Sequence, residues 1–441
     1  MNPLKSTMRF NHAYSTGVVL AVNAVPDAFL LLDAPACAQW RPGFIQGSHD
    51  STSTLWDSEG RHRFQISNTD IGRVVSGNME DLALRLGKMA TAPGCGAILA
   101  AGFPMALISG APYEAIWRNM KPVPSVPFFP VMGGSVSHDW LDGYAHTLLA
   151  LAKGVALPAT NRRPEDVAIV GYMYDRGERD HFANIAELRR MLGGIGLNLV
   201  SVWPSGTAIV DLAAVASAGT ILSFPYAREA ATVLAGRLGA SLIECGLPLG
   251  LNASADWIHK VGTAVGCKAE AESFAERELA RLVPRLAWAV ESIFLHSAFI
   301  FAGDPVMVKP LARQISDVGG RMVAAASMAG PHHAQALGSW DNLPFPVHDA
   351  PSHSVIFEMV AEADCIIGSV YDGPSQRTVE LGFPSYNSHA FHDRPYLGFE
   401  GSMCLLGRIA EDLLWSINHR ASPKTNSGDV HSRDYTSSEK V

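Results

Sequence analysis

The sequence lacks the short motifs by which many nucleotide-using and hydrolytic enzymes are recognised. Its 441 residues contain no GxxxxGK[ST] phosphate loop and no GxGxxG turn that follows a strand and opens a helix. HExxH and GxSxG are also absent. These absences argue against a self-contained dinucleotide enzyme, a zinc protease of this type or a serine hydrolase. We expect no nucleotide bound by this chain, so energy or electrons for any chemistry must come from elsewhere.

Charged residues and paired cysteines are scarce as well. Only 17% of the residues are charged and the net charge is −8, so we expect no nucleic-acid partner. The low charge density suggests that partner chains cover part of the surface. The cysteines are scattered without a CxxC pair, which is typical of a cytosolic protein and not of a disulfide framework. They are Cys37, Cys95, Cys245, Cys267, Cys365 and Cys404.

The sequence also lacks a leader or a membrane helix that we can identify. Residues 1–15 have no apolar core and no small-residue cleavage site. The longest uncharged stretch, residues 92–113, is interrupted repeatedly by glycine and proline. That composition favours a buried strand followed by a loop over a spanning helix. We therefore expect a cytoplasmic protein without membrane contact.

What the sequence does contain is one pattern that recurs along the chain: a short apolar strand, a glycine-containing loop and an amphipathic helix. Its length and its 48% hydrophobic content exceed what one compact domain needs. Alternating strands and helices predict an α/β fold, with three Rossmann-like regions of parallel sheet flanked by helices around a central cleft. The expected regions are residues 1–160, 161–293 and 294–420, followed by a polar, disordered tail at residues 421–441.

The first region begins with two apolar runs, Gly17–Val22 and Phe29–Asp33, which we interpret as buried strands. The small residues Ala34–Ala38 then predict a tight turn with the thiol of Cys37 at its tip. Such a thiol can bind a soft metal or an iron–sulfur cluster, although a lone cysteine after a strand is more often a small buried hydrophobe. Beyond a polar loop, we expect a helix over Met79–Met89 that Asn78 caps.

The remaining elements follow from the same pattern. The expected strands are 97–101, 126–131, 167–173, 197–202, 220–224, 241–244, 297–302, 321–327 and 365–368. The expected helices are 141–153, 182–191, 227–238, 255–265, 270–292, 354–361 and 401–418. Residues 161–165 are interpreted as a linker. Asp304 and Pro305 fit the cap and first position of a helix, and His138 and Asp139 are placed to cap the helix near Trp140.

Several segments, in order, resemble nitrogenase component 1, and in particular its beta-type subunit. Near the C-terminus these are Glu380–Pro384, His389, His392 and Leu397–Gly401. Upstream, the similar segments are 34–38, 136–140, 247–251, 301–305 and 363–369. The ordered match spans about residues 15–418. The beta-like chain of the cofactor scaffold and the subunits of dark-operative protochlorophyllide reductase belong to the same group.

The resemblance implies that Cys37 is a cluster ligand. Catalytic beta-type subunits supply three cysteines to a shared double cluster, and only Cys37 has a counterpart here. Gly102–Pro104 stands where the third would lie, and Cys95 precedes that strand and is interpreted as structural. The position similar to the alpha-type cofactor cysteine is near Ser223. Because a four-iron cluster takes four ligands, we expect a 4Fe-4S cluster shared with a partner that supplies three.

Further candidate residues follow from the same resemblance. His49, Asp50, His62 and Arg63 form a polar group after Cys37. A run of this kind is usually solvated surface, but in this family the segment lies near the subunit interface and the cluster.

The other candidates lie in the second and third regions. Tyr226 and Arg228 follow an expected strand and should face the cleft between regions, where open α/β sheets bind ligands. His389 and His392 lie on the C-terminal loop, and we expect them to hold that loop rather than to act in catalysis.

The resemblance implies a beta-type subunit of a nitrogenase-like oxidoreductase. It would pair with an alpha-type subunit in a heterotetramer and take electrons from a separate ATP-hydrolysing iron–sulfur protein. Electrons would pass through the interfacial 4Fe-4S cluster to a substrate in a cleft between subunits. The missing cofactor thiol argues against dinitrogen as the substrate. Two alternatives stay open: a scaffold for assembly of a nitrogenase-type metal cofactor, and a binding protein that kept the fold and lost the cluster.

The polar composition of the C-terminal 21 residues generates the first prediction. Truncation after Asn418 should leave the fold and partner binding unchanged, because residues 421–441 offer no apolar face to dock. Thermal unfolding of the truncated and full chains measures this, and a large drop in the midpoint would contradict it.

Overall fold

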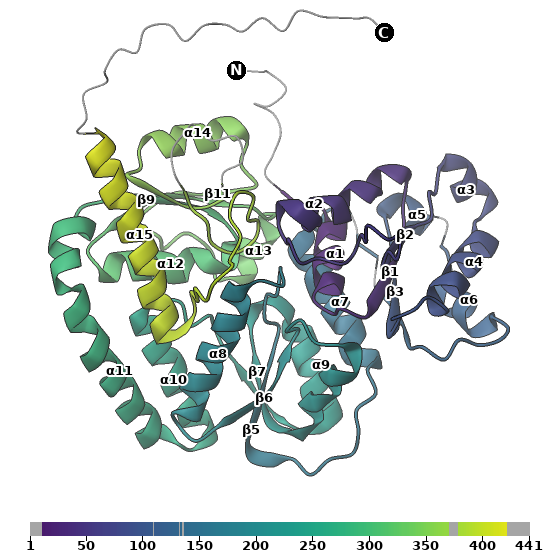
Figure 1. Ribbon diagram of the computed structural model, residues 1–441, viewed down its shortest axis with the longest axis horizontal. Helices are drawn as coiled ribbons and strands as arrows, with labels where there is room; N and C mark the ends of the chain where they lie inside the picture. Colours follow the sequence, from purple (N-terminus) through teal and green to yellow (C-terminus); the bar gives the residue numbers. More distant parts are fainter. Residues whose placement is uncertain (1–10, 109, 132, 135, 370–377, 421–441) are drawn as a thin grey trace, which may run out of the picture.

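The computed structural model describes residues 11–420 except 109, 132, 135 and 370–377, so the expected tail at 421–441 lies outside the described residues. Three parallel sheets, each flanked by helices, confirm the predicted α/β fold with three regions (Figure 1). In the figure the first region is purple to blue, the second teal, and the third green to yellow. One continuous hydrophobic core contains residues from all three.

The first region carries a sheet in the order β2-β1-β3-β4. Its strands are β1 Ala28–Asp33, β2 Phe64–Ile66, β3 Ala97–Gly102 and β4 Phe128–Pro130. Its helices are α1 Tyr14–Asn23, η1 Ala36–Gln39, α2 Trp40–Ser48, α3 Ile71–Ser76, α4 Met79–Ala90, α5 Pro104–Ile108, α6 Tyr113–Asn119 and α7 Trp140–Gly154.

The second region has a sheet in the order β6-β5-β7-β8. Its strands are β5 Arg163–Val170, β6 Asn198–Trp203, β7 Ala218–Ser223 and β8 Ser241–Glu244. Its helical segments are α8 Arg179–Gly193, η2 Ile209–Ser217, η3 Pro225–Ala227, α9 Arg228–Leu238, α10 Leu251–Val265, α11 Lys268–Ala289 and the π-turn η4 Val290–Phe294.

The third region has a sheet in the order β11-β10-β9-β12-β13. Its strands are β9 Ala298–Gly303, β10 Arg321–Ser327, β11 Val347–Asp349, β12 Cys365–Gly368 and β13 Thr378–Val379. Its helices are α12 Pro305–Asp317, α13 His332–Ala336, α14 His353–Ala361 and α15 Gly398–Arg420.

The carboxyl ends of β1, β5 and β9 lie at the switch points of the three sheets, where the strand order reverses. In each sheet the strand order reverses beside the first strand of the region, next to β3, β7 and β12 respectively. Loops that leave such a switch point diverge to opposite faces of the sheet and open a crevice at its carboxyl edge. The segments after these strands are therefore the places to look for function.

The interpretation of Gly17–Val22 as a strand is wrong, because these residues belong to helix α1. Nine consecutive residues of this helix are buried, so it shows no amphipathic pattern to distinguish it from a buried strand. It packs backbone to backbone on α7: a Cβ atom on Gly17 would lie 1.7 Å from the carbonyl oxygen of Trp140, and one on Gly143 would lie 2.0 Å from that of Tyr14.

Smaller differences also separate expectation from structure. The expected linker at 161–165 contains the start of β5, and the expected polar loop before α3 contains the short strand β2. Asn78 precedes α4 as expected but makes no side-chain capping bond. The caps of Asp304 and Asp139 are confirmed: Asp304 accepts a hydrogen bond from Val306 N at 2.9 Å, and Asp139 forms a capping box with Asp142.

Among the described residues, no helix combines the length and the apolar composition that crossing a bilayer would require.

The contact between α1 and α7 generates the second prediction. Gly17→Ala should destabilise the fold by about 3 kcal/mol or more, because the new methyl group can be placed only by separating two backbones. Gly236→Ala, in α9 with open space around it, is the matched control and should be neutral or stabilising by up to about 1 kcal/mol. Urea unfolding of both variants measures the difference, and equal midpoints would contradict the packing.

Candidate functional site

A network of hydrogen bonds at the end of β1 holds the turn that carries Cys37. Ser67 Oγ donates to Asp33 Oδ1 at 2.6 Å and accepts a hydrogen bond from Ala34 N at 3.0 Å. Thr69 N donates to the carbonyl of Ala34 at 3.0 Å. These bonds fix the chain where it leaves the sheet. The next residues form η1, with Cys37 exposed on it.

Asp33 is fully buried and lies at the centre of this hydrogen-bond network. Besides Ser67, its carboxylate accepts hydrogen bonds from Tyr113 OH at 2.9 Å and from Asn78 Nδ2 at 3.2 Å. The amide of Asn78 also donates to Thr69 Oγ1 at 2.9 Å, which explains why it does not cap α4. A buried carboxylate with this many donors is well compensated for the loss of water.

The other cysteines differ from Cys37 in their surroundings. Burial raises the pKa of the Cys95 and Cys245 thiols to about 11. It also raises the pKa values of the remaining three thiols, Cys267, Cys365 and Cys404. These five thiols are buried or half-buried, which makes them less accessible than Cys37 to a metal at the surface. The expectation that Cys37 lies at the surface is confirmed, since it is the exposed one of the six free cysteines.

Several large apolar side chains of the first region are exposed. Trp40, three residues after Cys37, is 73% exposed, and Ile71 and Val75 on α3 are 77% and 84% exposed. More than half of the large apolar side chains that are exposed among the described residues lie between residues 40 and 136. An accumulation of this kind is typical of a surface that another chain covers.

The polar group after Cys37 is mostly buried within the chain, so it is not the solvated surface that such a run usually forms. His49, Asp50 and Arg63 are 0%, 1% and 6% exposed, whereas His62 is exposed. Arg63 donates to the backbone carbonyls of Val25 and Ala28 at 3.2 and 2.6 Å. Arg63 therefore fixes the start of the first sheet and is not available to a partner.

His49 and Asp50 instead join the first region to the other two. Asp50 Oδ2 accepts a hydrogen bond from Gly177 N at 2.9 Å, in the second region. His49 Nδ1 accepts one from Ser385 N at 3.0 Å, in the third. His49 Nε2 lies 2.8 Å from Asp175 Oδ2, but the two atoms are not aligned for a hydrogen bond, so their attraction is mainly electrostatic.

Asp175 is the centre of this buried junction. His181 Nε2 donates to its other oxygen, and His181 Nδ1 pairs with Tyr172 OH at 2.8 Å. Burial alone would lower the pKa of His181, but the negative charges of Asp175 and Asp180 and the hydrogen bond to Asp175 raise it above its ordinary value. Burial alone would raise the pKa of Asp175, but His181 and His49 hold it well below its ordinary value.

The two C-terminal histidines have different surroundings. His389 pairs with the buried carboxylate of Glu178, whose other oxygen accepts a hydrogen bond from Ala390 N at 2.6 Å. These bonds attach the C-terminal loop to the second region, as expected for a residue that holds the loop. His392 is exposed.

A pocket of about 240 Å³ lies where the three regions meet, which places the expected cleft. Its walls include Asp142 and His146 from α7, Tyr226 from η3 and Arg228 from the start of α9. Residues of α12 and α13, such as Val306 and His333, complete them. Tyr226 and Arg228 therefore line this pocket.

Hydrogen bonds to neighbouring groups hold the side chains of Tyr226 and Arg228. Tyr226 OH donates to Asp304, whose pKa is raised to about 6 by burial. Arg228 donates to the backbone carbonyls of Ser223 and Cys245, the latter at 2.8 Å, so its guanidinium fixes the ends of β7 and β8. Ser223, the position similar to the alpha-type cofactor cysteine, is buried beneath it.

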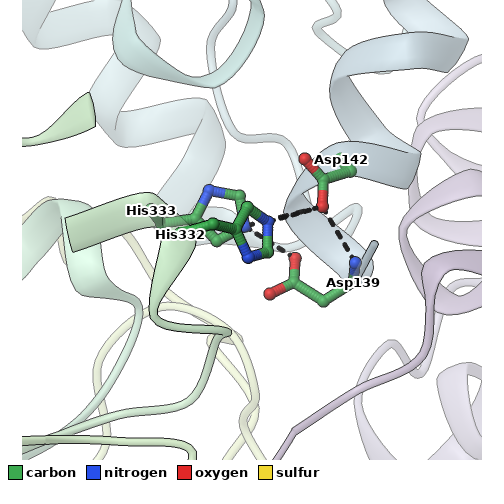
Figure 2. A group of neighbouring side chains, drawn as sticks. All are labelled: Asp139, Asp142, His332 and His333. Atoms are coloured by element: carbon green, nitrogen blue, oxygen red, sulfur yellow. Dashed lines mark hydrogen bonds and ion pairs between the residues drawn. The ribbon is translucent and has the colours of Figure 1, made fainter. Parts of the chain in front are cut away.

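Two aspartates and two histidines meet at one edge of this pocket (Figure 2). Asp139 caps α7 and Asp142 belongs to its first turn, whereas His332 and His333 open α13. His332 Nε2 donates to Asp142 Oδ2 at 2.9 Å, and His333 Nε2 donates to Asp139 Oδ1 at 2.8 Å.

The sequence analysis missed several residues that the structure brings together. Asp142, His332 and His333 were not singled out, and neither were Asp175 and His181. Two signals were present: a histidine pair in the loop after a predicted strand, and the polar run 174–181 directly after another. Both follow the carboxyl ends of parallel strands, where ligand-binding side chains commonly lie.

Comparisons with known proteins agree with one another. A family model described as "Nitrogenase component 1 type Oxidoreductase" matches residues 15–414. A nitrogenase molybdenum-iron protein beta chain from Bradyrhizobium sp. (strain ANU 289) is 23% identical over 347 residues, covering 70% of this chain and 64% of that protein. One from Sinorhizobium fredii (strain NBRC 101917 / NGR234) is 27% identical over 229 residues, covering 48% and 44%.

The chain thus spans between about two fifths and two thirds of the length of these curated relatives. Among solved structures, one titled "Nitrogenase Cp1 at pH 6.5" superposes with a TM-score of 0.76 at 14% identity, over 96% of both chains. At this identity the likeness shows a shared fold.

The buried junction generates the third prediction. Because the folded-state pKa of His181 is raised, its charged form stabilises the fold below pH ~6.5, and this stability is lost as the pH rises through the raised pKa. His181→Gln should therefore cost about 3–5 kcal/mol at low pH and less at high pH. Urea unfolding from about pH 5.5 to pH 9 measures the difference.

His62→Gln, the same substitution at an exposed histidine, is the control. A loss at His181→Gln that grows with rising pH would show that the neutral ring is the stabilising form.

Proposed function

We propose that this chain, which belongs to the family of nitrogenase component 1 type oxidoreductases, is the beta-type subunit of a nitrogenase-like reductase. Cys37 is its single thiolate ligand to a 4Fe-4S cluster at a subunit interface. An alpha-type subunit supplies the other three ligands, and two copies of each subunit form a heterotetramer. An ATP-hydrolysing iron–sulfur protein supplies the electrons.

The observation that carries this proposal is the exposed thiol of Cys37 on an anchored turn at the switch point of the first sheet. An interfacial cluster needs a thiol that faces outward, a fixed backbone beneath it and an apolar surface around it to exclude water. The network of Ser67 and Asp33 provides the fixed backbone. The exposed side chain of Trp40, three residues after Cys37, contributes apolar surface.

The neighbouring strand supports a single ligand from this chain. Gly102 pairs with Asp33 in the register of β3 and β1, so the segment after Gly102 leaves the sheet beside the segment that leads to Cys37. That segment, Phe103-Pro104, contains no thiol. The donor set thus fits one corner of a four-iron cluster and does not complete one.

The bound cluster would supply one-electron transfer. This chain's own residues act around it: Cys37 ligates one iron, the Asp33 network fixes the turn, and the apolar face excludes water. The substrate cleft lies between the subunits. The pocket between the three regions is a separate cavity within this chain, with Tyr226 held at its wall by Asp304. This chain itself binds no nucleotide, nucleic acid or membrane, and the six free cysteines fit a reducing compartment such as the cytoplasm.

A scaffold for assembly of a nitrogenase-type cofactor is the second candidate, because the single exposed thiol fits it equally well. Substrate turnover by the reconstituted complex separates the two functions. A reductase turns over with reductant and ATP, whereas a scaffold releases a metal cluster to an acceptor protein.

The fourth prediction concerns iron binding. In the complex co-expressed with its alpha-type partner under anaerobic conditions, Cys37→Ala should remove most of the iron and the broad visible absorption. The chain expressed alone should be nearly colourless, because one thiolate cannot hold four irons. Iron and sulfide analysis of the purified complexes provides the measurement.

Cys95→Ala is the matched control, because Cys95 is a half-buried thiol with a raised pKa on the same region. It should keep the wild-type iron content and cost about 1 kcal/mol of packing. Equal iron loss in both variants would make Cys95 a second ligand. Unchanged iron in both would favour a cluster-free binding protein.

A further inference from the structure

The group of Asp139, Asp142, His332 and His333 has the composition and placement of a metal site. Its members come from two distant parts of the chain, the start of α7 and the first turn of α13 (Figure 2). The spacing Asp139-x-x-Asp142 puts both carboxylates on one face of α7. The figure shows both imidazole rings facing these carboxylates.

The distances between donor atoms are close to those of a four-coordinate ion. One ligand atom from each residue can be chosen so that all four lie within 4.8 Å of one another. His333 Nε2 lies 2.8 Å from Asp139 Oδ1 and 3.7 Å from Asp142 Oδ2, and His332 Nε2 lies 2.9 Å from Asp142 Oδ2. Donors at about 2.1 Å around a tetrahedral ion lie roughly 3.4 Å apart, so small shifts admit the ion.

The carboxylates are already held in place from behind. Asp139 accepts hydrogen bonds from Gly330 N at 2.6 Å and from Leu141 N at 3.0 Å. Asp142 accepts one from Asp139 N at 2.9 Å. Such outer bonds orient ligands and reduce the cost of gathering them around an ion. The side chain of Asp139 is 2% exposed, whereas that of His332 is 41% exposed, so an ion can enter from the side of His332.

Charge and donor type indicate which ion fits. With neutral imidazoles the four side chains carry a charge of −2, which one divalent cation balances. Two imidazoles and two carboxylates suit Zn²⁺ and its first-row neighbours, whereas Mg²⁺ and Ca²⁺ prefer oxygen ligands alone. Each histidine hydrogen bond in the group would be replaced by a bond from Nε2 to the ion, and each neutral ring would then carry its single proton on Nδ1.

We propose that Asp139, Asp142, His332 and His333 bind one divalent transition-metal ion, with Zn²⁺ preferred over Mg²⁺ and Ca²⁺. Asp142 and His333 also line the pocket between the three regions, so the ion lies at the pocket wall. It joins the first region to the third and presents a face on which water or an oxygen ligand from the pocket can bind. This site is separate from Cys37 and does not depend on the iron–sulfur cluster.

The experiment is a titration of the full chain, purified without its partner and freed of metal by a chelator. Zn²⁺ binding is followed by competition with a chromogenic chelator, and Co²⁺ binding by visible d–d absorption. The expected result is one ion per chain, with Mg²⁺ failing to compete. His332→Gln/His333→Gln should weaken the affinity at least ~100-fold. Cys37→Ala should leave it unchanged, which excludes binding by the thiol.

His296→Asn is the matched control, because His296 is an exposed loop histidine at φ 66°, a conformation that asparagine also adopts. It should bind the ion as the wild type does. If the double variant fails to fold, X-ray absorption at the zinc edge of the wild-type protein decides the question: two imidazoles and no sulfur support the site. Failure of the wild-type chain to bind Zn²⁺, or binding through sulfur, would show that these residues are only ion pairs between two regions.

Discussion

A buried carboxylate follows the first strand of each of the three sheets. Asp33 ends β1, Asp175 follows β5, and Asp304 follows β9, and all three are 0% exposed. Removing a carboxylate from water costs several kcal/mol unless donors surround it, so each position dictates the neighbours that it needs. The loops at the switch points of all three sheets are shaped by this requirement.

Different donors surround the three carboxylates, and each carboxylate therefore has a different role in the structure. Asp33 is surrounded by neutral hydroxyl and amide donors of its own region, so the turn above it is fixed while Cys37 stays exposed. Asp175 is paired with histidines, one of which also accepts a backbone hydrogen bond from the third region. Asp304 caps α12 and accepts the hydroxyl of Tyr226 at the pocket wall.

The same arrangement separates a rigid interior from two accessible faces. The junction around Asp175 joins all three regions through a fully buried network, which leaves little freedom for them to move independently. The exposed apolar surface lies on the first region around Trp40, where a partner chain can cover it. The group at Asp139 and His333 lies where the start of α7 reaches the third region.

The sequence by itself determined the fold class and most of the elements. Strands β8, β10 and β12 begin and end as expected, because short apolar runs between glycines or polar residues have few alternatives. Helix α1 could not be assigned from sequence, since a helix buried on all sides has no periodicity, and its packing depends on Gly143 far along the chain. The exposed turn of Cys37 followed from local residues, whereas the burial of His49 did not.

Only the tertiary structure decided the remaining sites. His49 approaches Ser385 across 336 positions of sequence, and His333 approaches Asp139 across 194. No local pattern in the sequence indicates such pairs, because each of the two partner residues fits equally well into an ordinary loop or helix cap. Residue type and spacing predict where a strand ends and which side chains follow it. Which strand ends face one another depends on how three sheets share one core, and that is set by packing over the whole chain.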